Sequence, residues 1–86
     1  MRLQPNTIRR IELINLVGIS KLRKYCRIHH PGENFNRNIQ LMRDYIKYGT
    51  GYIITHYNIT AEYSRLLIRR YAKYAKEILE GGDSDG

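Results

Sequence analysis

Four cationic residues recur at a spacing of three or four near the end of the chain, at Arg65, Arg69, Lys73 and Lys76. An α-helix turns through about 100° per residue, so these side chains lie along one helical face. Guanidinium and ammonium groups in such a row are suited to contacts with phosphates and with the edges of bases. The spacing therefore predicts a cationic face that fits a nucleic acid.

The element that must position these cations is a long helix predicted over residues 61–79. Its other half is apolar and would pack on a core. The residues of that half are Tyr63, Leu67, Ile68, Tyr71, Tyr74, Ala75, Ile78 and Leu79. Gly81 and Gly82 would end the helix. One face of this helix is thus predicted to be buried and the other to be exposed and basic.

A short helix over residues 52–57 precedes the long helix, and the two together predict a helix–turn–helix over residues 51–79. Ile53, Ile54 and Tyr57 are expected to face inward from the short helix. In the turn, Asn58 tolerates the left-handed conformation, and Thr60 is a good N-cap for the long helix.

This arrangement assigns DNA contacts to nine residues. Tyr52 would donate to a phosphate. Thr60, Ala61, Glu62 and Ser64 would lie closest to the groove. Arg65 and Arg69 would contact phosphates or base edges, and Lys73 and Lys76 would extend the phosphate contacts. The sequence does not indicate which groove of the DNA these residues would contact.

Three further helices are predicted by apolar residues at helical spacing, over residues 7–17, 20–29 and 36–48. No alternating run indicates a strand pair. We therefore expect an all-α fold, a small bundle of four to five helices with the helix–turn–helix at its C-terminal end. Residues 1–80 would form a single domain. The glycine-rich acidic tail, residues 81–86, is expected to be disordered.

The 86-residue chain is strongly basic, with 15 Lys and Arg against 8 Asp and Glu and a formal net charge of +7. A compact domain with this charge repels itself, so a negatively charged partner is expected. Nucleic acid and anionic membrane are the usual candidates. The longest apolar stretch, residues 11–19, is interrupted by polar residues and too short to span a bilayer. It does not resemble a signal peptide either. Binding to a membrane surface is the least expected, because the apolar faces are consumed by packing in a chain with several helices.

No group of residues predicts catalysis. Asp44 has no paired carboxylate at a useful spacing, and Ser20 and Ser64 have no base nearby in the sequence. Gly49-Thr50-Gly51 lacks the Lys-Ser/Thr that completes a phosphate-binding loop. We therefore expect a protein that is not an enzyme and that uses no cofactor.

Cys26 is the only cysteine, which excludes an intrachain disulfide and favours a reducing cytoplasm. Together with His29 and His30 it could suggest a metal. Structural zinc takes four ligands at paired spacings, and no second pair exists here. No metal site is expected, and Cys26 is expected to be partly buried.

Several alternatives remain. The cationic face of residues 61–79 could be a solvated surface without a ligand. The basic segment Lys21–His30 could contact phosphates, lie at an oligomer boundary or be solvated. The chain as a whole could instead be a protein-interaction module, such as an antitoxin or a small adaptor, or a binder of structured RNA.

Short motifs resemble the PapB-type regulators of fimbrial (adhesin) operons in enteric bacteria. They are Leu16-Val17-Gly18-Ile19-Ser20, then Met42-Arg43-Asp44-Tyr45 before Gly49, and finally Tyr57, Tyr63 and Arg70. The resemblance covers residues 13–79. It implies a cytoplasmic, nucleoid-associated bacterial transcription regulator that binds AT-rich double-stranded promoter DNA and forms homo-oligomers on it. An apolar surface on residues 8–17 could serve that assembly, or it could complete the monomer core.

Overall fold

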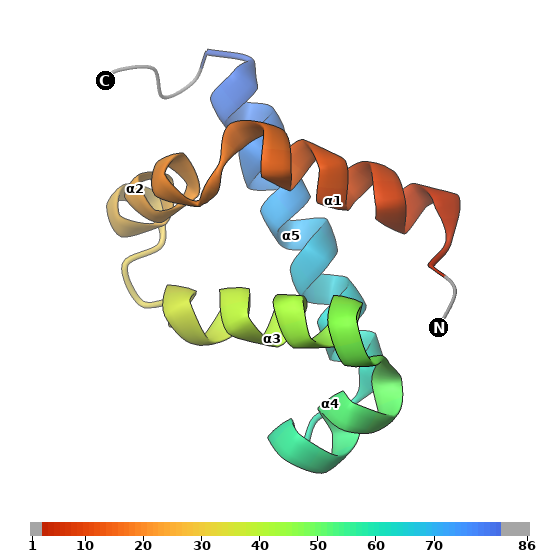
Figure 1. The fold of residues 1–86 in the computed structure, drawn as a ribbon. Coiled ribbons are helices and arrows are strands. Elements are labelled where there is room, and N and C mark those ends of the chain that lie inside the picture. Colours follow the sequence, from red (N-terminus) through yellow and green to blue (C-terminus); the bar gives the residue numbers. More distant parts are fainter. Residues whose placement is uncertain (1–2, 82–86) are drawn as a thin grey trace.

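The computed structural model describes residues 3–81 and contains five α-helices in that range (Figure 1). They are α1 (Pro5–Val17), α2 (Ile19–His29), α3 (Phe35–Tyr48), α4 (Thr50–Tyr57) and α5 (Ala61–Leu79). All regular structure between residues 3 and 81 is helical, which confirms the predicted all-α class. Most of the expected tail, residues 82–86, lies outside the described residues.

Two glycines join consecutive helices without a loop. Gly18 ends α1 and begins α2, and Gly49 ends α3 and begins α4. Their φ angles of 94° and 93° are unfavourable for side chains with a Cβ. Each amide still completes the helix it ends, with Gly18 N–H donating to the Ile14 carbonyl at 2.9 Å and Gly49 N–H to the Tyr45 carbonyl at 3.0 Å. The chain can therefore turn sharply while its backbone hydrogen bonds are kept.

Four helices start one or two residues earlier than predicted, whereas α5 starts at Ala61 as predicted. α1 begins at Pro5, because proline lacks the N–H that the first helical turn leaves unpaired. α2 and α4 begin directly after their glycines, at Ile19 and Thr50. In α3 the first residue is Phe35, since the Asn34 side chain caps the helix by accepting from the Arg37 N–H at 3.2 Å.

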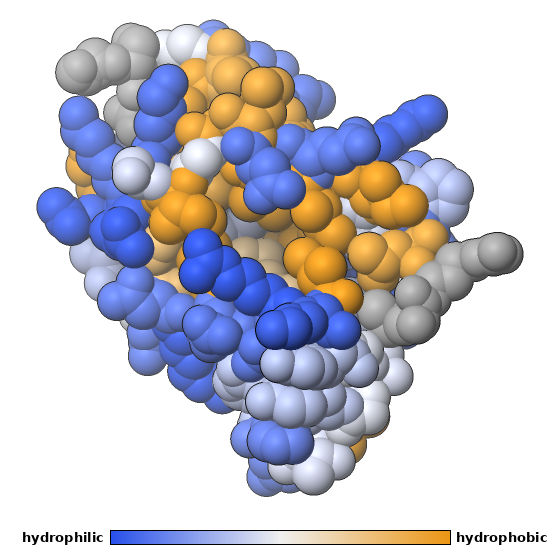
Figure 2. Space-filling view, in the orientation of Figure 1, coloured by the Kyte–Doolittle hydropathy of each residue, from blue (hydrophilic) through white to orange (hydrophobic). Residues whose placement is uncertain are grey.

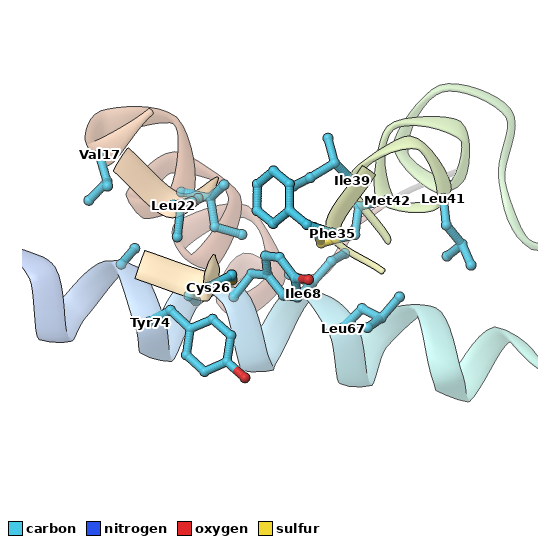
Figure 3. Close-up of a cluster of buried hydrophobic side chains, with 14 of the residues drawn as sticks. Val17, Leu22, Cys26, Phe35, Ile39, Leu41, Met42, Leu67, Ile68 and Tyr74 are labelled. Carbon is cyan, nitrogen blue, oxygen red and sulfur yellow. The ribbon is translucent and has the colours of Figure 1, made fainter. Parts of the chain in front are cut away.

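The core forms around α5, which runs through the centre of the molecule (Figure 1). Leu67, Ile68 and Tyr71 of α5 are at most 1% exposed. Side chains from α1, α2 and α3 pack over these residues, and Figure 3 shows this packing around Leu67 and Ile68. The covering residues in that view are Val17, Leu22, Cys26, Phe35, Ile39, Leu41 and Met42. Burial of these apolar side chains is the main force that holds the bundle together.

Two apolar residues that were expected to face inward do not. Ile54 is 52% exposed, because α4 is only eight residues long and packs through Ile53. Leu79 is 51% exposed in the last turn of α5, where the helix projects past its neighbours. Tyr25, in contrast, is buried within the basic segment. No helix within residues 3–81 has both the length and the apolar character needed to cross a membrane.

A small apolar hollow opens between α1 and α3, with side chains of both helices around it (Figure 2). Its volume is about 90 Å³. Ile11 and Ile14 line one side, Met42 and Ile46 the other, and Ile68 of α5 also contributes. Further along α1, Ile8 and Leu16 are exposed by 42% and 72%. Only part of the apolar surface of α1 is therefore used within this chain.

Candidate nucleic-acid interface

The turn between α4 and α5 consists of Asn58, Ile59 and Thr60. Asn58 is left-handed, with φ 57° and ψ 42°, and its N–H donates to the Ile54 carbonyl at 3.1 Å. The Thr60 hydroxyl accepts from the Tyr63 N–H at 3.2 Å and so caps α5. The predicted conformation of Asn58 and the predicted cap are both confirmed.

A short hydrogen bond ties α4 to α3. The Tyr57 hydroxyl donates to Asp44 Oδ2 at 2.5 Å, and the Arg37 guanidinium lies 5.9 Å from the Tyr57 ring centre. The bond to the carboxylate favours the neutral phenol and raises the pKa of Tyr57 to about 12. This contact holds the end of α4 just before the turn, so the entry into α5 is fixed.

We call the row Arg65, Arg69, Lys73 and Lys76 the α5 ridge. All four residues are exposed, whereas Leu67, Ile68, Tyr71 and Ala75 on the opposite face are buried. The helix is 19 residues long, and the ridge extends along most of it. The predicted division of this helix into a buried apolar face and an exposed basic face is confirmed.

Within residues 3–81, one member of the α5 ridge forms an ion pair. Arg65 Nη1 lies 3.0 Å from Glu62 Oε1, one turn earlier, with side-chain exposures of 46% and 75%. An ion pair this exposed contributes at most about 1 kcal/mol, so a phosphate can displace it. Within residues 3–81, Arg69, Lys73 and Lys76 have no carboxylate within ion-pair distance. The ridge therefore keeps a net positive field.

Ser64 was predicted to lie near the groove, and this is wrong. The residue is 0% exposed, and its Oγ has no hydrogen-bond partner among residues 3–81. Ser64 precedes Leu67 and Ile68 by three and four residues, so it continues the buried stripe of α5 rather than the exposed one. Ala61 is partly buried, whereas Thr60 and Glu62 are exposed at the start of the helix.

Tyr52 lies in a stack of three rings on α4 and the end of α3. Its ring centre is 4.4 Å from that of Tyr48 and 3.8 Å from that of His56, with interplanar angles of 24° and 12°. The stack fixes the direction of the ring. The Tyr52 hydroxyl has no hydrogen-bond partner within residues 3–81, so it can donate to an added acceptor.

A buried polar network that the sequence did not predict lies on the inner side of α5. The carboxylate of Glu33, in the loop after α2, accepts from the hydroxyls of Tyr71 at 2.9 Å and Tyr74 at 2.7 Å. Asn38 Nδ2 in turn donates to the Tyr71 oxygen at 3.1 Å, and Arg70 lies 3.9 Å from Glu33. Burial, reinforced by the bond to Glu33, raises the pKa of both tyrosines. We call these residues the Glu33 network; it fastens the α2–α3 loop to α5.

Cys26 lies beside this network and is buried, as expected. Burial, together with the negative charge of Glu33, raises the pKa of its thiol to about 11. The thiol is therefore protonated at neutral pH and is a poor nucleophile. In the part of the chain that the structure describes, no three His, Cys, Asp or Glu side chains come together as metal ligands.

No protein-family model, no curated protein and no solved structure matches the chain.

Proposed function

We propose that this protein is a DNA-binding transcriptional regulator that contacts double-stranded DNA through α4 and α5. The observation that carries the proposal is the α5 ridge, an exposed row of four cations whose helix is anchored in the core on its opposite face. A rigid helix with outward-facing Lys and Arg at regular spacing can follow a line of phosphates. The fixed turn at Asn58–Thr60 sets the angle at which that helix is presented.

In this proposal α4 lies across the DNA backbone, and the first turns of α5 enter a groove. The Tyr52 hydroxyl donates to a phosphate from a ring that its stacked neighbours hold in place. Glu62, Arg65 and Arg69 meet base edges or nearby phosphates, with Thr60 and Ala61 at the entry to the groove. Lys73 and Lys76 continue the backbone contacts along the helix.

Self-association on the DNA is part of the proposal. It is supported by two separate observations, the exposed apolar side chains Ile8 and Leu16 on α1 and the apolar hollow between α1 and α3. The short motifs shared with PapB-type regulators make an AT-rich bacterial fimbrial promoter the first DNA to test. The same resemblance and the single free cysteine support a cytoplasmic location in a bacterium as part of this proposal.

The deciding experiment is charge reversal on the α5 ridge. Arg65→Glu combined with Arg69→Glu should weaken binding to an AT-rich promoter duplex by at least about a hundredfold, because two phosphate contacts become repulsive. Fluorescence anisotropy at several salt concentrations measures this, and wild-type affinity should fall steeply with salt. Circular dichroism should show an unchanged helix content, since both side chains are exposed.

The matched control is Arg9→Glu combined with Lys21→Glu, which changes the charge equally at exposed positions on α1 and α2. It should lower affinity only modestly. Equal loss in the two double variants, or wild-type affinity for duplex DNA no better than for heparin, would contradict the proposal. Tighter binding to a structured RNA than to the duplex would favour the RNA-binding alternative.

A further inference from the structure

The second basic surface of the molecule lies on α2. This helix carries Lys21, Arg23, Lys24 and Arg27 and has no acidic residue. All four cations are exposed, and within residues 3–81 none of them forms an ion pair. Charged helices usually balance such repulsion with a carboxylate three or four residues away. The imbalance on α2 is therefore a reason to look for a negative partner.

Two of these cations border a cleft. It has a volume of about 330 Å³ and lies between the second half of α2, the following loop and the first turn of α3. Arg23 and Arg27, one helical turn apart, line it together with His30, Glu33, Asn34 and Phe35. Lys21 and Lys24 do not line it. The volume is within the range of sites that hold a small ligand.

Contacts with the core hold the lining in place. The Arg23 guanidinium carbon lies 5.4 Å from the centre of the buried Phe35 ring. The His30 ring stacks on Tyr74 with a centroid distance of 4.5 Å and an interplanar angle of 16°. Aromatic packing of this kind restricts both side chains before any ligand arrives, which lowers the entropic cost of binding.

The carboxylate in the lining has partners other than the two arginines. Both oxygens of Glu33 accept tyrosine hydroxyls in the Glu33 network, and Arg70 lies 3.9 Å away as a counter-charge. The cleft therefore combines two unpaired guanidinium groups with a carboxylate whose oxygens are already hydrogen-bonded. A guanidinium group can bind a phosphate through two parallel, charge-assisted hydrogen bonds to two of its oxygens.

We propose that this cleft is a phosphate-binding site, separate from the α5 ridge, in which Arg23 and Arg27 hold the phosphate oxygens. The same group occurs in free nucleotides and in the backbone of a nucleic acid. The site does not depend on the function of the α5 ridge, because it shares no residue with it.

The test compares two double variants of one helix. Arg23→Gln with Arg27→Gln removes the two charges in the cleft, and Lys21→Gln with Lys24→Gln removes two charges outside it. Inorganic phosphate and AMP are titrated into each protein and followed by NMR, and a labelled DNA duplex is followed by anisotropy. Wild type should saturate with AMP or phosphate, with shifts confined to residues 23–36. The cleft variant should bind at least about tenfold more weakly, and the control less than about twofold, because only the cleft arginines form charge-assisted bonds.

The two sources of phosphate give different patterns. Saturable AMP binding that the cleft variant alone loses assigns the site to a free nucleotide. If AMP and phosphate do not saturate, but the cleft variant alone loses DNA affinity, the site holds a backbone phosphate. Equal effects of the two double variants on every probe, or no effect of either, would overturn the proposal. If the protein binds AMP but does not bind DNA, the phosphate-binding site is supported and only the proposed DNA-binding function is contradicted.

Discussion

The two basic surfaces of the molecule have similar charge and different geometry. On the α5 ridge, four exposed cations follow one another along one helix, and Arg65 is paired with Glu62. On α2, two cations converge on a cleft whose lining is packed against aromatic rings. A row of cations suits a ligand with negative charges repeated along a line, whereas a cleft suits a single anionic group. Charge alone would not have separated these two kinds of site.

Both surfaces depend on α5, but on opposite sides of it. The ridge lies on the outer side, and the inner side carries Tyr71 and Tyr74, which hold the loop that borders the cleft through Glu33. Substitutions can therefore separate the two. A change on the inner side should affect stability and the cleft, whereas a change on the outer side should affect DNA binding and leave stability almost unchanged.

The largest effect is expected for Tyr71→Phe. The substitution removes the hydroxyl that donates to Glu33 and accepts from Asn38, and it leaves the amide of the 5% exposed Asn38 without its partner. An unsatisfied buried polar group costs about 1–3 kcal/mol, so the free energy of unfolding should fall by that amount. Urea denaturation followed by circular dichroism measures the change.

Tyr74→Phe is the matched control, because the Tyr74 hydroxyl bonds Glu33 and leaves Asn38 untouched. Its cost should be smaller, about 1 kcal/mol. DNA affinity of both variants, measured at a temperature where they are folded, should equal that of the wild type. A larger loss for Tyr74→Phe than for Tyr71→Phe would contradict the role given to Asn38.

A smaller effect, of opposite sign, is expected for Glu62→Gln on the α5 ridge. The change frees Arg65 from its neighbour at 3.0 Å and removes a negative charge that would face the DNA in the proposed complex. DNA affinity should rise by about two- to fivefold, since exposed pairs of this kind contribute at most about 1 kcal/mol. Stability should fall slightly, because Glu62 is an acidic residue in the first turn of α5.

Glu12→Gln makes the same change in net charge at an exposed position on α1. If the gain in DNA affinity comes from the ridge, this control should gain less than Glu62→Gln in the same anisotropy assay. Equal gains would mean that only the total charge matters. A loss of affinity and of sequence preference in Glu62→Gln would instead show that Glu62 reads a base.

The sequence was sufficient for the features that depend on local periodicity. The spacing of Leu67, Ile68 and Tyr71 against Arg65 and Arg69 predicted both faces of α5, because side chains four residues apart share a face whatever surrounds the helix. The turn at Asn58 was likewise predictable, since few residue types tolerate a positive φ. The starts of α2 and α4 were less certain, because Gly18 and Gly49 each end one helix and directly begin the next.

Features built from distant parts of the chain were not predictable. Glu33 and Tyr71 are 38 positions apart, and no local pattern relates a loop carboxylate to two core tyrosines. The cleft beside α2 is lined by one continuous stretch, residues 23–36, but helical periodicity does not give the angle at which α3 leaves the loop after α2. The basic segment was visible in the sequence, but the separation of its arginines from its lysines required the fold.

Ser64 tests where the exposed face of α5 ends, and its replacement should have the smallest effect. Ser64→Ala removes a hydroxyl that is fully buried and has no hydrogen-bond partner in the described part of the chain. The free energy of unfolding should therefore stay the same or rise by up to about 1 kcal/mol, because an unsatisfied polar group is lost and alanine favours the helix. DNA affinity should not change, since the side chain faces the core beside Leu67 and Ile68. Urea denaturation and anisotropy on one protein preparation measure both quantities. A several-fold loss of DNA affinity with unchanged stability would mean that Ser64 becomes exposed and contacts the DNA when the complex forms.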